Sequence, residues 1–140
     1  MFKTRTLDPA NMTNERGKRT WEWKQDDGRQ TTLCVRIEGE SFGNHFHKGD
    51  DPAKNPELFL LLEGKVWIRF TDKNGAREVA TLDATEKPIE LIIMPFVLHE
   101  LKATTKCKYI ETRPNHFDPN HPDTYPLEEF YRLFPKAASQ

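Results

Sequence analysis

The sequence lacks the features that mark several specialised classes of protein. It has only two cysteines in 140 residues, Cys34 and Cys107, and two distant cysteines do not make a disulfide framework. No stretch approaches the roughly 20 apolar residues of a membrane span, and the N-terminus has no apolar run typical of a signal peptide. A net charge of −1 gives no field that would attract nucleic acid or anionic membranes. We therefore expect a cytoplasmic, single-domain protein without nucleic-acid or membrane partners.

What the sequence does contain is a series of short segments with strand character. Residues 20–25 alternate tryptophan with charged residues, and residues 30–39 are β-branched and alternate in polarity. Similar segments follow at regular intervals as far as residue 113, and turn residues such as Gly28 and the Asn74-Gly75 pair separate them. About nine strands with no helix among them predict an all-β sandwich or barrel.

The two ends of the chain have a different character. Residues 1–18 form a predicted N-terminal arm, residues 19–113 the β-barrel, and residues 114–140 a loop and helix packed on the barrel. The helix is expected over residues 126–134, where apolar side chains recur at helical spacing on one face. These side chains are Leu127, Phe130, Tyr131 and Phe134.

One stretch, residues 43–64, carries residues with metal-binding chemistry. Side chains alternate along a strand, so His45 and His47 point to one face. Glu57 opens the next apolar strand, which we expect to return antiparallel beside the histidine strand, and His99 lies on a later strand. Three imidazoles and a carboxylate suit one divalent transition metal per chain, such as Fe, Mn, Ni, Co or Zn. Glu57 could alternatively orient an imidazole or act as a general base.

This stretch resembles the first sequence motif of the cupin family, G(X)5HXH(X)3–4E(X)6G. His45 and His47 match the HXH, and six residues separate Glu57 from Gly64. Residues 94–99, "MPFVLH", resemble the second cupin motif, which contains a proline and ends on a histidine. Two departures are that nine residues separate His47 from Glu57, and that Phe96 and Leu98 stand where many members have Gly and Pro.

The resemblance implies a fold, a ligand set and a partner. It implies a cupin double-stranded β-helix (jelly-roll barrel) in which His45, His47, Glu57 and His99 bind the metal, and a homodimer paired through its sheets. Within the family, residues 43–70 look most similar to small cupins of surface-polysaccharide pathways. Cupins include isomerases, epimerases, lyases, dioxygenases and non-catalytic binders, so the fold alone does not set the reaction.

Strand parity suggests which side chains surround the metal. Phe59 and Leu61 share the face of Glu57 and are expected to line a substrate cavity. Trp67 and Arg69 share one face of their strand. If that face is the inner one, Arg69 can hold a carboxylate or phosphate, and the alternative is an exposed arginine on the outer face.

The last strand offers three further candidates on one face. Tyr109 and Glu111 are candidate acid or base residues, and Arg113 is a candidate substrate-binding residue. A cross-strand ladder of ion pairs explains this pattern equally well. His116 and His121 lie in a Pro- and Asn-rich loop and are expected to be solvated. The two cysteines are expected to be small apolar core residues.

These residues predict a metal-dependent enzyme that acts on a small polar, carbonyl-bearing or sugar-like substrate. The reaction is an isomerase or epimerase, lyase or dioxygenase type. Two alternatives remain open at this point. One is a metal-free sugar-nucleotide cupin in which a histidine is the base and arginines hold the diphosphate. The other is a non-catalytic cupin that binds a small ligand.

Overall fold

Two facing antiparallel sheets form the body of the protein. The computed structural model describes residues 1–7 and 18–139. Within these residues, one five-stranded sheet has the order β1 (Arg19–Lys24), β2 (Gln30–Arg36), β9 (Cys107–Arg113), β4 (Glu57–Glu63), β7 (Ile89–Ile93). The other has the order β10 (Tyr125–Pro126), β3 (Ser41–Phe46), β8 (Leu98–Ala103), β5 (Lys65–Thr71), β6 (Arg77–Asp83).

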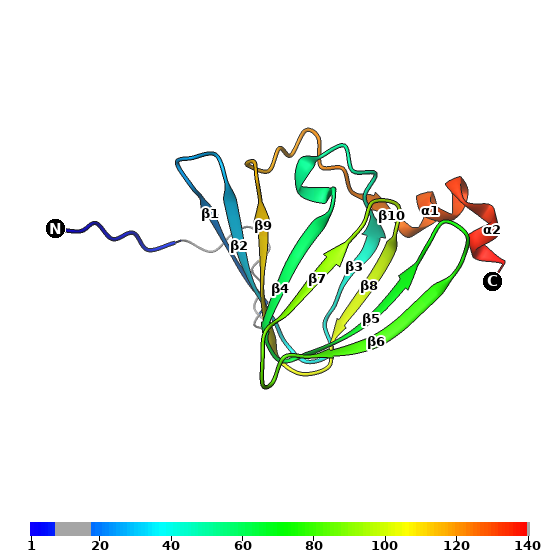
Figure 1. Ribbon diagram of the computed structural model, residues 1–140, viewed down its shortest axis with the longest axis horizontal. Helices are drawn as coiled ribbons and strands as arrows, with labels where there is room; N and C mark the ends of the chain where they lie inside the picture. The colour runs from blue at the N-terminus through cyan, green and yellow to red at the C-terminus, as the bar shows by residue number, and fades with distance from the viewer. Residues whose placement is uncertain (8–17, 140) are drawn as a thin grey trace.

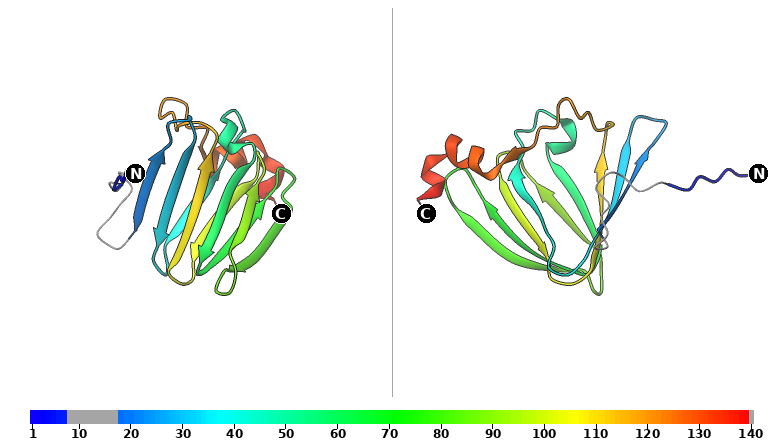
Figure 2. Two further views of the ribbon diagram at one scale, coloured as in Figure 1. Left: turned by 60° about the vertical axis from the view of Figure 1, so that its left-hand side comes forward. Right: turned by 180° about the vertical axis from the view of Figure 1, so that it is seen from behind.

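The sheets are the walls of a barrel that is closed at one end. Figure 1 shows them approaching each other at one end and diverging at the other. At the diverging end, the connection that contains the 3₁₀ helix η1 (Pro52–Lys54) and the segment before β10 each pass from one sheet to the other. The left view of Figure 2 shows β1, β2, β9 and β4 side by side in one wall. The expected all-β jelly-roll barrel with a short C-terminal helix is confirmed.

Glycines permit the tight turns between strands. The β1–β2 and β5–β6 hairpins turn at Gly28 and Gly75, whose φ angles are 90° and 88°. Gly64 also has a positive φ, 90°, where the chain leaves β4 for β5 in the other sheet. A Cβ added at Gly64 would lie 2.3 Å from the backbone oxygen of Lys106. Only glycine therefore allows this close approach of the two backbones.

The pairing of the strand that begins at Glu57 differs from the sequence prediction. We expected it to run beside the histidine strand, but β4 pairs with β7 and β9, whereas β3 pairs with β8 and β10. The connection 47–56, which contains η1, carries the chain from one sheet to the other. Glu57 therefore approaches the histidines from the facing wall of the barrel.

The main hydrophobic core fills the space between the sheets at the closed end. Cys34 and Cys107 lie in this core, as expected, and burial raises the pKa of the Cys107 thiol to about 11. Both are free, buried cysteines, so they pack as small apolar groups. The other fully buried members are Leu61, Val66, Ile68, Ala84, Leu101, Ala103 and Tyr109.

A second apolar cluster lies on the outside of the second sheet. Two short helices, α1 (Leu127–Leu133) and α2 (Pro135–Ala138), cover it. Phe130 of α1 is fully buried against Phe46 of β3, with ring centroids 5.3 Å apart. No helix among the described residues is long and apolar enough to cross a membrane. Most of the predicted N-terminal arm, residues 8–17, lies outside the described residues.

Candidate metal centre

Four predicted ligands meet inside the barrel near its open end. His45, His47, Glu57 and His99 each offer one ligand atom, and these atoms all lie within 4.8 Å of one another. Their imidazole centroids are 4.6 to 5.1 Å apart. His47, Glu57 and His99 are almost fully buried, at 2%, 2% and 1% exposure. The cluster therefore joins residues from both sheets at one point.

Local backbone geometry aims the histidines inward. A β-bulge interrupts the pairing of β3 with β8 between Gly43 and His45, and Asn44 between them has a φ of 62°. Bulges bend a strand and re-aim its side chains. After the bulge His45 pairs with His99, and Phe46 points to the opposite face, against α1. His47 follows directly and returns to the inner face.

The hydrogen bonds of two rings leave Nε2 free to bind a cation. His47 Nδ1 donates to the backbone oxygen of Asp123 at 2.7 Å, and His99 Nδ1 donates to that of Val97 at 3.0 Å. Each Nε2 then presents a lone pair toward Glu57 Oε2, at 2.9 and 3.5 Å respectively. His99 Nε2 has no hydrogen-bond partner among the described residues. Lone pairs directed at a carboxylate need a cation between them, so the residues fit a metal ion.

The pKa values of two of the imidazoles favour the neutral, metal-binding form of the ring. Burial, followed by the nearby imidazoles, lowers the pKa of His45 to about 3, and burial lowers that of His99 to about 4. Both rings are therefore neutral near pH 7, the form that binds metal. Burial opposes ionisation of Glu57, but its contacts with His47 and the charge of Lys54 outweigh it and hold its pKa well below the ordinary value.

Lys54 is a member of the site that the sequence analysis missed. Its Nζ forms an ion pair with Glu57 Oε1, and it contacts Glu111 Oε1 at 2.6 Å. The lysine is only 8% exposed and comes from η1, between the two sheets. Burial raises the pKa of the Glu111 carboxyl. In the sequence, the one signal for Lys54 was its position three residues before Glu57.

The cluster opens into a cavity of about 470 Å³. Phe59 and Arg113, predicted to contact substrate, line this cavity, as do the acid or base candidates Tyr109 and Glu111. Leu61, also expected in the cavity wall, lies in the core beyond them. Tyr109 stacks on Phe42 at 5.3 Å and meets the edge of Phe59 at 5.4 Å. Arg36, which was not predicted, also lines this cavity.

Trp67 and Arg69 do not line the cavity. The inner residues of β5 are Val66 and Ile68, which are buried in the core, so the alternating residues face outward. Arg69 donates from Nε and Nη2 to Glu100 on the neighbouring strand, both at 2.6 Å. Of the two alternatives for this pair, the structure has the outer face, so Trp67 and Arg69 are not substrate-binding residues of this cavity. Periodicity alone could not decide this, because it does not say which face of a strand is buried.

Arg113 is buried but already paired. Its Nη2 contacts Asp51 Oδ2 at 2.5 Å, and the two side chains are 4% and 7% exposed. His116 and His121 are exposed in the loop after β9, as expected. They contact the backbone oxygen of Gln25 and the carboxylate of Asp118, so they belong to no ligand cluster of the described residues.

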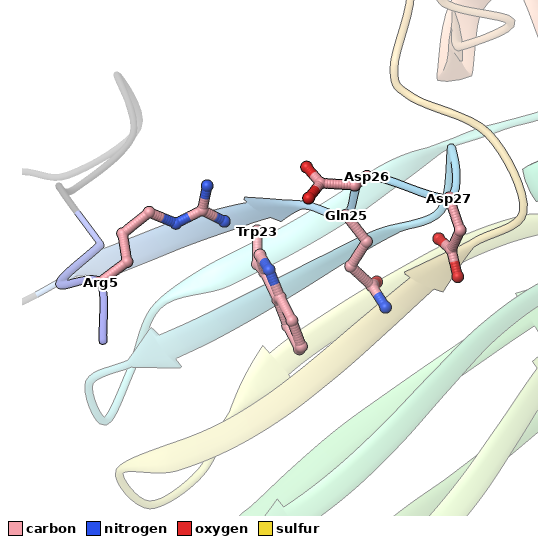
Figure 3. A pocket seen from close by; sticks show the side chains of 5 residues that line it. All are labelled: Arg5, Trp23, Gln25, Asp26 and Asp27. Atoms are coloured by element: carbon pink, nitrogen blue, oxygen red, sulfur yellow. The ribbon is translucent and has the colours of Figure 1, made fainter. Parts of the chain in front are cut away.

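A separate hollow of about 370 Å³ lies on the outer side of β1 (Figure 3). Figure 3 shows the Trp23 ring beside Gln25, with Arg5 on one side and the two aspartates of the β1–β2 turn, Asp26 and Asp27, on the other. Trp23 is 45% exposed. No residue of this hollow lines the cavity of the cluster, so it belongs to a different face of the molecule.

The barrel and its His/Glu cluster define a cupin, and comparison with solved structures agrees. CapF of Staphylococcus aureus, titled a capsular polysaccharide assembling protein, matches with a TM-score of 0.71 and 26% identity over 89% of this chain and 32% of that one. A variant of oxalate decarboxylase from Bacillus subtilis matches at 0.64 and 13% identity, over 96% and 38%. A cupin superfamily protein from Desulfitobacterium hafniense matches at 0.54 and 18% identity, over 74% and 83%.

Comparison with family models gives the narrower placement. The chain belongs to the polysaccharide biosynthesis C-terminal domain family, whose model matches residues 12–125. It is thus a cupin related to those of polysaccharide pathways. It spans about a third of the length of CapF and of oxalate decarboxylase. No curated protein sequence matches it.

Proposed function

We propose that this chain is a metal-dependent isomerase or epimerase of a small, carbonyl-bearing, sugar-like substrate. The observation that supports the proposal most directly is the cluster of His45, His47, Glu57 and His99 at the wall of a cavity. The family match to polysaccharide biosynthesis supports the sugar-like substrate. A divalent transition metal held by these four residues would supply a Lewis acid that polarises a carbonyl oxygen.

The residues beside the cluster supply the remaining chemistry. Glu111 contacts Lys54 Nζ and keeps 20% of its side chain exposed, so its carboxylate can meet a substrate in the cavity. We assign Glu111 the transfer of a proton to and from the carbon next to the carbonyl. Lys54 holds both glutamates in place. Tyr109 stacks on Phe42, meets the edge of Phe59 and is 6% exposed, so it acts as a wall that excludes water.

Metal content is the first test. Protein purified without chelator should contain about one metal ion per chain by plasma mass spectrometry, with Fe, Mn, Ni, Co or Zn as candidates. The double variant His45→Ala/His47→Ala should lose it. The matched control His116→Ala/His121→Ala removes two exposed loop histidines and should retain it. A folded wild-type protein that neither contains nor takes up these metals contradicts the proposal.

Proton transfer is the second test. Free and phosphorylated keto-sugars are incubated with the metal-loaded protein in D₂O, and NMR follows exchange of the hydrogen next to the carbonyl. The Glu111→Gln variant should slow exchange by about 10²-fold or more while metal content stays the same. Exchange at the wild-type rate in this variant removes Glu111 from the mechanism.

One observation favours a second candidate function. Two arginines, Arg36 and Arg113, line the cavity, as expected of a metal-free sugar-nucleotide cupin in which a histidine is the base. However, Arg113 is neutralised by Asp51. The metal measurement separates the two candidates, because the second requires full activity without bound metal.

We also propose a homodimer formed through the outer face of the first sheet. The register places Trp21, Leu33, Ile110 and Leu60 in one row across β1, β2, β9 and β4. Leu60 is 37% exposed, and a contiguous apolar row on the face of a sheet is typical of an interaction surface. A second copy of this chain could cover the row with its own. Light scattering should report a dimer for wild type and a monomer for Leu60→Glu, whereas the exposed control Val79→Glu on β6 should remain dimeric.

A further inference from the structure

We propose that Arg36 forms an anion-binding subsite that holds a phosphate or carboxylate group of the substrate. Arg36 ends β2, is only 3% exposed, and lines the same cavity as the histidine cluster. This inference rests on the proposed function, which places the carbonyl end of the substrate at the histidine cluster. The subsite adds that the opposite end of the substrate carries an anionic group.

Among residues 1–7 and 18–139, the Arg36 guanidinium forms no ion pair with a carboxylate. Nη1 donates to the backbone oxygens of Val35 at 2.9 Å and Arg19 at 3.3 Å, which are neutral acceptors. Nε is buried without a hydrogen-bond partner among the described residues. The two other arginines predicted for the site each have a carboxylate, Asp51 for Arg113 and Glu100 for Arg69. A buried, permanently charged guanidinium without a counter-ion is costly, so this geometry favours an external anion.

Aromatic rings hold the guanidinium in place. Its central carbon lies 5.5 Å from the centroid of Tyr109 and 5.9 Å from that of Phe42, and these two rings are stacked on each other. Cation–π contacts orient the planar group without neutralising its charge. The planar fork of N–H donors then matches a phosphate or a carboxylate.

The register of the sheet sets the length of the substrate. Arg36 pairs with Cys107 at the start of β9, whereas Glu111 lies four residues further along the same strand. At about 3.3 Å per residue this corresponds to roughly 13 Å along the wall. The subsite therefore selects an extended substrate, with its anionic substituent well separated from the carbonyl that reaches the cluster. A two-carbon acid is too short to contact both Arg36 and the histidine cluster.

Calorimetric titration of inorganic phosphate, and separately of malonate, tests the subsite on protein with its metal. Wild type should bind at least one of the two, and the anion that binds identifies the source of the charge. Arg36→Met should bind it about tenfold more weakly or worse, with unchanged metal content. The control Arg77→Met, an exposed arginine on β6, should match wild type. Should Arg36→Met fail to fold, Arg36→Lys retains the charge, loses the fork, and should still bind more weakly.

The double variant His45→Ala/His47→Ala separates this inference from the proposed function. It should lose metal and still bind the anion. Anion binding that disappears in the double variant and persists in Arg36→Met places the anion on the metal and overturns the subsite. The subsite is equally overturned if neither anion binds wild type. A third outcome is that the wild type contains no metal but its anion binding still depends on Arg36. That result overturns the metal-dependent function and supports the subsite.

Discussion

The Nδ1 atom of His47 donates to the backbone oxygen of Asp123 at 2.7 Å, across 76 positions of sequence. This bond fixes the tautomer of the ring and directs Nε2 to the candidate metal centre. The Asp123 carboxylate in turn accepts from the backbone N–H groups of Lys48, Gly49 and Asp51 at 2.9 to 3.0 Å. The loop beyond the barrel thus holds both the ligand and the segment that follows it.

Asp123→Ala keeps the backbone oxygen that accepts from His47 but removes the carboxylate that holds this loop against residues 48–51. The oxygen would then lose its fixed position beside His47, so metal binding should weaken by about 10-fold. Competition with a chromophoric chelator measures the affinity, and the visible spectrum of the Co(II)-loaded protein reports the ligand geometry. Asp118→Ala, an exposed aspartate in the same loop, is the control and should leave both unchanged. An Asp123→Ala variant with lower stability but wild-type affinity and spectrum would mean that Asp123 only stabilises the fold.

Lys54→Met should destabilise the protein by about 3–5 kcal/mol, because it leaves the buried carboxylate of Glu57 and the half-buried one of Glu111 without their shared cation. Urea unfolding in chelator, which removes the contribution of metal, measures the change. The matched control is Lys65→Met, since Lys65 forms an exposed pair with Asp83 and should cost only about 0–1 kcal/mol. Equal costs for the two variants would contradict the assigned role of Lys54.

The buried pair of Asp51 and Arg113 should make stability depend on pH. Burial raises the pKa of Asp51, but the hydrogen bond and charge of Arg113, together with the hydrogen bonds from Ala53 and Asn115, outweigh it, so the folded pKa lies below the ordinary value of 3.8. A lowered pKa contributes stability above the unfolded value, and this stability is lost as the pH falls through the folded pKa. Wild type should therefore exceed Asp51→Asn by about 2 kcal/mol at pH 6, with the difference shrinking below pH about 4. Urea unfolding at several pH values measures it, and a pH-independent difference would contradict the assignment.

Gly64→Ala should destabilise the barrel by well over 1 kcal/mol, because the new Cβ would lie 2.3 Å from the backbone oxygen of Lys106. Gly28→Ala is a close control, since Gly28 has the same φ of 90° but no atom within 4 Å of its Cβ position. It should cost only about 1–2 kcal/mol, the backbone term alone. Urea unfolding compares the two, and equal costs would mean that backbone strain, not the close approach, requires glycine at position 64.

The sequence by itself determined the strands, the all-β class and the four residues of the His/Glu cluster. Alternation along a strand is a local property, so it already placed His45 and His47 on one face. The spacing from Glu57 to Gly64 and the later His99 completed a motif that the structure brings together. The helix near the C-terminus followed from its apolar spacing.

Tertiary structure alone decided which faces and which distant residues meet. Periodicity gives each strand two faces but does not say which is buried, so the orientation of Trp67 and Arg69 could not be settled. The partner of β4 depended on a connection that crosses between the sheets. The contacts of Lys54 with Glu111 and of His47 with Asp123 join residues 57 and 76 positions apart, respectively. Nothing local in the chain encodes such distances, because they arise only when the two sheets close into a barrel.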